Sequence, residues 1–188
     1  MSSTPSLFDK LMIAREMQFS NGSVSMFGHR VVMPPARLFS EYIKMVDNDP
    51  KYTDLLYESA RISFREGMGK DLQKRFKFHI NDFFNWLPKI SALAGWGDAT
   101  IDQFIPEKHY GIITCRDSPV VRGLKGSVHG PVDHVLRGFI TGSTETMYGI
   151  VEGISTVEVE CENDGYKMCK FVFNPMLKGI PRETETDS

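Results

Sequence analysis

Apolar residues recur every three or four positions in five stretches of the chain, a spacing that gathers them on one side of an α-helix. The pattern predicts helices at residues 7–19, 36–46, 52–70, 81–94 and 131–147. Pro88 lies inside the fourth stretch and predicts a kink or a break, because proline cannot donate a helical backbone hydrogen bond. Pro131 suits the first turn of the fifth helix, and Asp133 lies where the helix dipole favours an anion.

Shorter stretches rich in β-branched and aromatic residues alternate with these helices and are bounded by turn-forming residues. They predict strands at residues 24–26, 31–33, 99–105, 110–115, 155–162 and 166–173. The last two are joined by Asn163, Asp164 and Gly165, which are typical of a hairpin turn. Nothing in this order requires parallel strands connected by crossover helices. We therefore predict an α+β fold with an antiparallel sheet and helices packed on it.

The chain has 188 residues, no internal repeat and no long linker, which predicts a single domain of ordinary size. We expect an N-terminal helical segment at residues 1–20, the domain itself at 21–174, and a disordered polar tail at 175–188. The glycine-rich segment 118–130 matches neither the phosphate-binding nor the dinucleotide-binding pattern, and it predicts a mobile loop.

Charge and composition exclude several classes of protein. The 22 lysines and arginines nearly balance the 24 aspartates and glutamates, so we expect no direct binding to nucleic acid. No apolar run is long enough for a membrane span, no secretory signal is recognisable, and three cysteines are too few for a disulfide scaffold. We therefore expect a cytoplasmic protein, whose 13 phenylalanines and 10 methionines fill a core or line a small-molecule pocket.

The predicted hairpin at residues 155–173 carries two of the three cysteines. Alternation along its first strand places Cys161 on the same face as the valines, which predicts that this face turns to the core, and places Glu158 on the opposite face. A three-residue loop at 164–166, with or without a bulge, sets Cys161 directly opposite Cys169. The pattern therefore predicts two facing thiols on the core side.

Two facing thiols have three fates: inert core residues, a cross-strand disulfide, or half of a metal site. Zinc needs two further ligands, and the candidates by residue type are His129, Asp133, His134 and Glu158. In a regular strand Glu158 faces away from the cysteines, so it can join them only if the strand bulges or ends there. The residues alone leave the three alternatives open.

Several segments of the chain resemble the 4-vinyl reductase domain family. The matching segments are residues 28–34, 55–60, 138–142, 157–161 and 169–172. The resemblance spans residues 20–174, and it is strongest from Gly138 onward. The family includes an accessory protein of bacteriochlorophyll synthesis and the sensor domains of phenol-responsive transcription activators. Its fold resembles that of a TRAPP vesicle-tethering subunit, so the resemblance implies the same fold here.

The resemblance also implies a metal site. In the phenol sensors a zinc ion is held by a cysteine, then a glutamate, a cysteine three residues on and a cysteine eight further. Glu158, Cys161 and Cys169 match the last three positions, whereas the first falls near Asp133, where this chain has no cysteine. Asp133 or the neighbouring His134 can replace that cysteine, since both residue types bind zinc.

Three functions follow from this reading. The first is the binding or sensing of a small hydrophobic, aromatic ligand in an internal apolar pocket, by a homodimer that pairs through the small residues of the helix at 52–70. The second is a tetrapyrrole vinyl-group reductase or its accessory protein, although we find no nicotinamide or flavin motif. The third is a dimerising, TRAPP-like adaptor. Trp86, Trp96, His109 and Tyr110 are available to contact a ligand, although core or surface positions account for them better.

Overall fold

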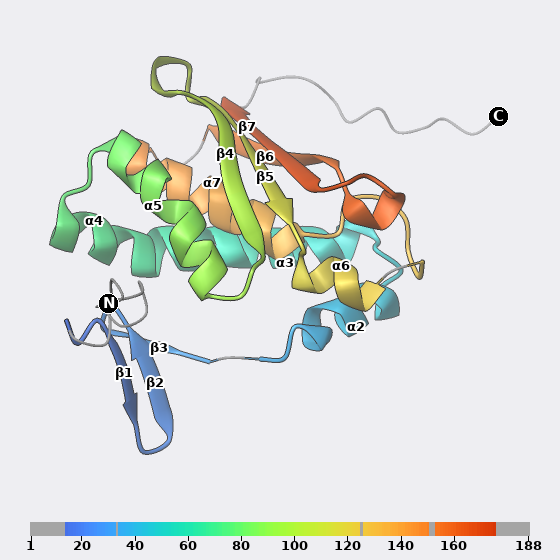
Figure 1. The fold of residues 1–188 in the computed structure, drawn as a ribbon, viewed down its shortest axis with the longest axis horizontal. Coiled ribbons are helices and arrows are strands. Elements are labelled where there is room, and N and C mark those ends of the chain that lie inside the picture. The colour runs from blue at the N-terminus through green and yellow to red at the C-terminus, as the bar shows by residue number, and fades with distance from the viewer. Residues whose placement is uncertain (1–13, 33, 125, 151–152, 176–188) are drawn as a thin grey trace, which may run out of the picture.

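The computed structural model describes residues 14–32, 34–124, 126–150 and 153–175. Its elements form two antiparallel sheets with helices between and beside them, which confirms the predicted α+β class (Figure 1). The first sheet has three strands in chain order: β1 (Met17–Ser20), β2 (Ser23–Met26) and β3 (His29–Val31). The main sheet has the order β4-β5-β7-β6, with β4 (Asp98–Ile105), β5 (Tyr110–Arg116), β6 (Ile154–Glu160) and β7 (Cys169–Pro175).

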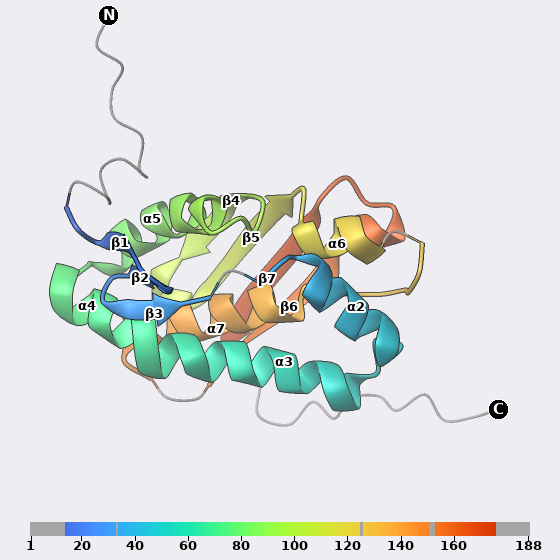
Figure 2. The same cartoon turned by 90° about the horizontal axis from the view of Figure 1, so that it is seen from below.

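The helices follow the apolar periodicity closely. They are α2 (Arg37–Met45), α3 (Pro50–Ser63), the π-helical turn η1 (Phe64–Gly69), α4 (Lys70–Phe76), α5 (Ile80–Leu93), α6 (Pro119–Leu124) and α7 (His134–Tyr148). In Figure 2, α3 and α7 run side by side, and α7 lies between α3 and the main sheet. Helix α7 is therefore buried on almost every side along its first three turns. In the described part of the chain, no helix is both long and apolar enough to cross a membrane.

Glycines allow α3 and α7 to approach closely. A Cβ atom added at Gly138 would lie 2.3 Å from the carbonyl oxygen of Tyr57, and one added at Gly142 would lie 2.4 Å from that of Arg61. Two glycines four residues apart share one face of a helix. They give α7 a side-chain-free strip against which the backbone of α3 packs.

Three predicted elements differ from the structure. Residues 17–19, expected in the N-terminal helix, form β1 instead, and residues 1–13 lie outside the described residues. The helix expected at 52–70 ends at Ser63 and continues as a π-helical turn, in which Gly67 leaves helical geometry (φ −104°, ψ −107°). Pro175, expected in the polar tail, closes β7, and residues 176–188 lie outside the described residues.

The sequence predicts a kink or a break at Pro88 and a mobile loop at residues 118–130. Helix α5 does not break at Pro88, since it continues to Leu93. The segment expected to be a mobile loop contains α6, which packs so tightly on α2 that a Cβ at Gly123 would lie 2.1 Å from the Oγ of Ser40. The Ser40 hydroxyl also donates to the carbonyl of Val120 at 2.9 Å. These contacts hold the segment in a helix that local sequence does not predict.

Candidate metal centre

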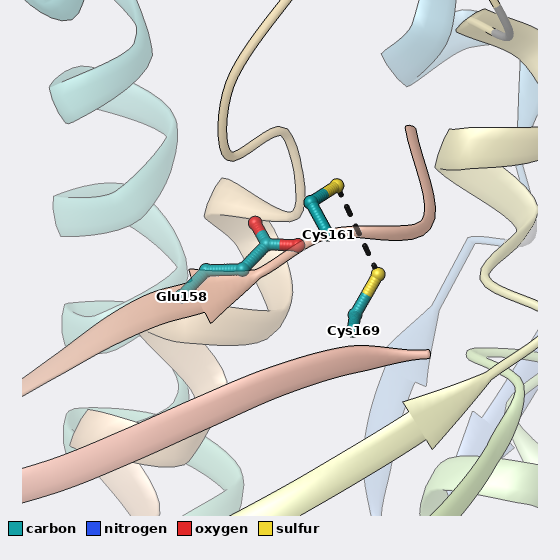
Figure 3. A group of neighbouring side chains, drawn as sticks. All are labelled: Glu158, Cys161 and Cys169. Atoms are coloured by element: carbon teal, nitrogen blue, oxygen red, sulfur yellow. Dashed lines mark hydrogen bonds between the residues drawn. The ribbon is translucent and has the colours of Figure 1, made fainter. Parts of the chain in front are cut away.

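The candidate site lies where β6 leads into the turn to β7, and a β-bulge shapes it. The pairing of the two strands shifts between Glu158 and Glu160, which leaves Val159 as the extra residue. Alternate residues up to Glu158 are buried, whereas Val157 and Val159 are 48% and 49% exposed, so the prediction that the valines face the core is wrong. The bulge reverses the alternation. Glu158 and Cys161 consequently both lie on the buried side (Figure 3).

The two hairpin cysteines face each other, as predicted. The thiol of Cys169 donates to the sulfur of Cys161 with the two Sγ atoms 3.9 Å apart, and both residues are buried. The loop between them is longer than the three residues predicted, because β6 ends at Glu160 and a short 3₁₀ turn, η3 (Glu162–Asp164), intervenes before β7. Both cysteines are free thiols, so the disulfide alternative is not the state of this structure.

The carboxylate of Glu158 is buried but only half satisfied. Its Oε2 atom accepts hydrogen bonds from the backbone N–H groups of Val132 (2.9 Å) and Asp133 (3.0 Å), which immediately precede α7. Its Oε1 atom is buried without a hydrogen-bond partner. The anion favoured at the start of α7 is therefore a carboxylate from the neighbouring hairpin.

The carboxylate of Asp133 is also buried, with a hydrogen bond to only one of its two oxygens. It is 1% exposed, and its Oδ1 atom accepts a hydrogen bond of 2.8 Å from the hydroxyl of Ser118. Its Oδ2 atom is buried without a partner. Although Asp133 occupies the N-cap position of α7, its side chain does not cap the helix. An unpartnered, buried carboxylate oxygen is costly, and two of them border the same pair of thiols.

His134 is directed away from the cysteines. Its Nε2 atom lies 2.8 Å from Oδ1 of Asn48, and its Nδ1 atom lies 3.0 Å from Nη1 of Arg137. Both ring nitrogens are thus occupied by other residues. Burial, together with the positive charge of Arg137, lowers the pKa of His134 to about 4. Of the two residues predicted to complete the site, only Asp133 offers an unoccupied ligand atom.

The electrostatics of the site favour a bound cation. Burial raises the pKa of Glu158 to about 8 and that of Asp133 to about 7, and each carboxylate also feels the other's negative charge or a neighbouring thiolate. The hydrogen bond from Cys169 lowers the pKa of Cys161, and the same bond raises that of Cys169. Acidic groups brought together in a dry interior oppose ionisation, and a divalent cation reverses that preference.

Cys115, the third cysteine, lies next to the site without joining it. It pairs with Cys169 across β5 and β7, and its thiol donates to the carbonyl of Trp96 at 3.3 Å. Burial raises its pKa to about 12. Cys115 therefore remains a protonated, packed thiol that behaves as a small hydrophobic residue.

The three buried donors, two sulfurs and one carboxylate oxygen, suit zinc in type and spacing. Glu158, Cys161 and Cys169 each offer a ligand atom, and these atoms lie within 4.8 Å of one another. Two sulfurs bound tetrahedrally at about 2.3 Å from zinc lie about 3.8 Å apart, close to the 3.9 Å between the two Sγ atoms. Asp133 lies outside this group of three. The group of buried side chains is therefore able to bind a metal ion.

Sequence reasoning missed two partners of the site. The hydroxyl of Ser118 fixes Asp133, and the backbone N–H of Val132 fixes Glu158. Ser118 precedes Pro119 in a segment that the sequence predicts to be a loop, so no local pattern marks it. The predicted helix start at Pro131 was the available signal, because unpaired N–H groups gather at that end of a helix, although α7 begins three residues later, at His134.

Comparison with known proteins identifies the fold. No family profile matches this sequence, and no curated protein matches it. The phenol-responsive sensory domain of the transcription activator PoxR, solved with phenol, is 19% identical and superimposes with a TM-score of 0.71 over 94% of both chains. A trafficking protein particle complex subunit 3 from Naegleria fowleri, covalently bound to palmitic acid, is 13% identical. It superimposes with a TM-score of 0.52 over 79% of this chain and 95% of that one.

A vinyl-4-reductase family protein from Methanocaldococcus jannaschii gives a TM-score of 0.48 at 22% identity, over 77% of this chain and 83% of that one. The likeness to the first two structures confirms the predicted fold, an antiparallel sheet with packed helices like that of a TRAPP subunit.

Proposed function

We propose that this domain binds a small hydrophobic, aromatic ligand and that a structural zinc ion, held by Glu158, Cys161, Cys169 and Asp133, supports its fold. The observation that carries the metal half is the pair of buried, unpartnered oxygens, Oε1 of Glu158 and Oδ2 of Asp133, beside two thiols with sulfurs 3.9 Å apart. A cation bound between these two carboxylates and the two thiols gives both oxygens a partner.

A zinc ion bound there ties three elements together. The ligands come from the end of β6, the start of β7 and the residue before α7. Zinc supplies a closed, four-coordinate cross-link of the kind found in structural sites. The four side chains are each at most 2% exposed, and such a closed, buried position supports a structural role.

The ligand half of the proposal rests on the shared fold and on the interior. PoxR, whose sensory domain was solved with phenol, has this fold over 94% of both chains. Inside the present domain aromatic rings contact one another in a continuous series: Phe27, Phe76, Phe78, Trp86 and Phe83. Such rings favour an aromatic ligand over an aliphatic one of equal size.

The proposal includes a homodimer. On α3, the face turned away from α7 exposes apolar side chains, with Leu55 61% and Ile62 47% exposed. Ser59 and Ser63, two of the small residues predicted at the dimer contact, lie exposed on the same helix. A contact between copies through this face is self-complementary, as a two-fold dimer requires.

A thermal-shift experiment tests the ligand half. Phenol at about 100 times its Kd should raise the melting temperature by about 5 °C, whereas cyclohexanol, of similar size but without an aromatic ring, should raise it much less. Equal shifts for both compounds would contradict an aromatic site. Oxidation of a reduced nicotinamide or flavin in the presence of a tetrapyrrole would favour the reductase instead, and a stable ligand-independent hetero-complex would favour the adaptor.

A further inference from the structure

The turn between β2 and β3 holds a phenylalanine in an unusual conformation. Phe27 and Gly28 form the two-residue turn, and both have positive φ, 55° and 85°. A turn of this kind favours Asn-Gly or Gly-Gly, and a bulky residue with positive φ is an outlier that its surroundings must hold in place. Phe27 is nevertheless only 3% exposed.

Two aromatic side chains contact the Phe27 ring, and a third packs on both of them. Its centroid lies 6.0 Å from that of Phe76, edge-on at 90°, and 5.5 Å from that of Trp86. Phe78 completes the group, since it stacks on Phe76 at 5.3 Å and lies 5.3 Å from Trp86. We refer to Phe76, Phe78 and Trp86 as the aromatic box. The box lies where α4 ends and α5 begins, and the Phe27 ring fills it from outside.

The first sheet meets the helices at this end and extends away from them at the other (Figure 1). Besides Phe27, two ion pairs fasten this end: Glu16 with Arg75, and His29 with Asp71. Both pairs are partly exposed to solvent, and exposed ion pairs contribute little to stability. The turn is therefore attached mainly by apolar contacts: the buried Phe27 ring, and Met17 and Met26 of the same sheet, which pack against the core.

The box opens toward solvent rather than toward the closed core. Phe76 is 39% exposed even with Phe27 in place. Withdrawal of the turn would uncover a slot, lined by aromatic faces and edges, of the size of one phenyl ring. The strained backbone of Phe27 makes that withdrawal easier, because the strain is released when the turn leaves.

We propose that the aromatic box is the binding site for the single ring of a small aromatic ligand, and that Phe27 occupies it in the ligand-free protein. This inference rests on the proposed function and specifies both the ligand class and its regulation. The ligand takes the place of the Phe27 ring, and the β1–β3 sheet is released from the helices as the readout of binding. Competition with Phe27 weakens the apparent affinity by the fraction of molecules in which the box is free.

The experiment compares three proteins with phenol as the probe: wild type, Phe27→Asn and Phe84→Ala. Phe27→Asn removes the ring but creates the Asn-Gly sequence that this turn prefers. Phe84→Ala is the matched control, because it removes another buried ring, 1% exposed, which stacks on Phe173 at 5.3 Å outside the box. Calorimetry measures the affinity for phenol, and hydrogen exchange reports on the backbone of residues 17–31.

In the wild type, phenol should accelerate exchange in residues 17–31 while it protects residues 76–86. If the box is free in about one molecule in ten, Phe27→Asn should bind phenol about tenfold more tightly, with exchange in 17–31 already fast before phenol is added. Phe84→Ala should bind with the affinity of the wild type. The exchange measurement on the wild type needs no variant to fold.

Two results would overturn the inference and leave the proposed function intact. In the first, the wild type binds phenol without any change in exchange at residues 17–31, which places the ligand elsewhere. In the second, Phe27→Asn and Phe84→Ala gain equally in affinity for phenol, which shows only that any cavity left by a removed ring accepts a small aromatic molecule. Failure of both the wild type and Phe27→Asn to bind phenol would instead count against the proposed function itself.

Discussion

Glu158 reaches the two cysteines because one neighbouring residue, Val159, is left out of the strand pairing. In a regular strand Glu158 and Cys161, three residues apart, lie on opposite faces, so without that extra residue the carboxylate and the thiol would not share the buried side. The backbone N–H groups of Val132 and Asp133 then fix one carboxylate oxygen and leave the other directed into the site. A single inserted residue therefore decides whether this hairpin is able to bind a metal ion.

Cys161→Ser should abolish the zinc site. Wild-type protein expressed with added zinc should contain about one zinc ion per chain, and the variant less than about one tenth of that. Chelator should lower the melting temperature of the wild type but not that of the variant, because only the wild type has a metal to lose.

Cys115→Ala is the matched control for this experiment. It removes a buried thiol that lies opposite Cys169 but outside the ligand group. Its zinc content should equal that of the wild type. Equal zinc in all three proteins, or none in any of them, would contradict the assignment of Cys161 as a ligand.

Asp133→Asn should weaken zinc binding at least about tenfold, the scale on which loss of a supporting or ligating group acts at metal sites, whereas His134→Gln should retain the metal. The reason is geometric: Asp133 has a buried oxygen without a partner, and both ring nitrogens of His134 are occupied by Asn48 and Arg137. Competition with a chromogenic zinc chelator measures both affinities. A greater loss of zinc affinity in His134→Gln than in Asp133→Asn would assign His134 as the fourth ligand.

At the scale of helices and strands, α3 and α7 owe their close contact to Gly138 and Gly142. Gly142→Ala should lower the free energy of unfolding by about 2–4 kcal/mol, because the new methyl group meets backbone rather than a flexible side chain. Ser59→Ala on the exposed side of α3 is the control, and its effect should stay within about 0.5 kcal/mol. Urea denaturation measures both, and a mild effect at Gly142 would mean that α3 moves aside without cost.

The local pattern of apolar residues predicted the helices and strands that have strong periodicity. It failed where contacts between residues far apart in the sequence decide the local structure. The register that sets Cys161 opposite Cys169 follows from the hairpin sequence, and it is correct. The face of β6 does not follow, because valines alternate with glutamates and the pattern assigns the valines to the core. Helix α6 was missed, since its tight contact at Gly123 comes from Ser40, far away in the sequence. The sequence does not distinguish Asp133 from His134 as the proposed fourth ligand; the hydrogen bonds that occupy both ring nitrogens of His134 are what favour Asp133.

At the scale of the whole molecule, we expect two copies to associate through the exposed face of α3. Light scattering should give about twice the 21.3 kDa of one chain. Ile62→Arg should convert the dimer to a monomer, because it places a charge in an apolar contact.

Val157→Arg serves as the control for the dimer experiment. Val157 has nearly the same exposure, 48% against 47% for Ile62, but lies on β6 of the main sheet. Its substitution should leave the mass in solution unchanged. A wild-type mass of one chain at micromolar concentration would contradict the homodimer.

The buried ion pair between α3 and α7 has a mechanical consequence. Two helices that meet through glycines have a smooth contact, along which one can slide past the other by a turn, about 5.4 Å. The fully buried Glu145 prevents this, since its two oxygens are gripped by the guanidinium fork of Arg61 and by Arg65. A slide of one turn would leave the carboxylate of Glu145 buried without its arginine partners. We therefore expect α3 and α7 to move together as one rigid unit. Any displacement that a ligand produces must then pass to the parts of the chain attached at the ends of these two helices.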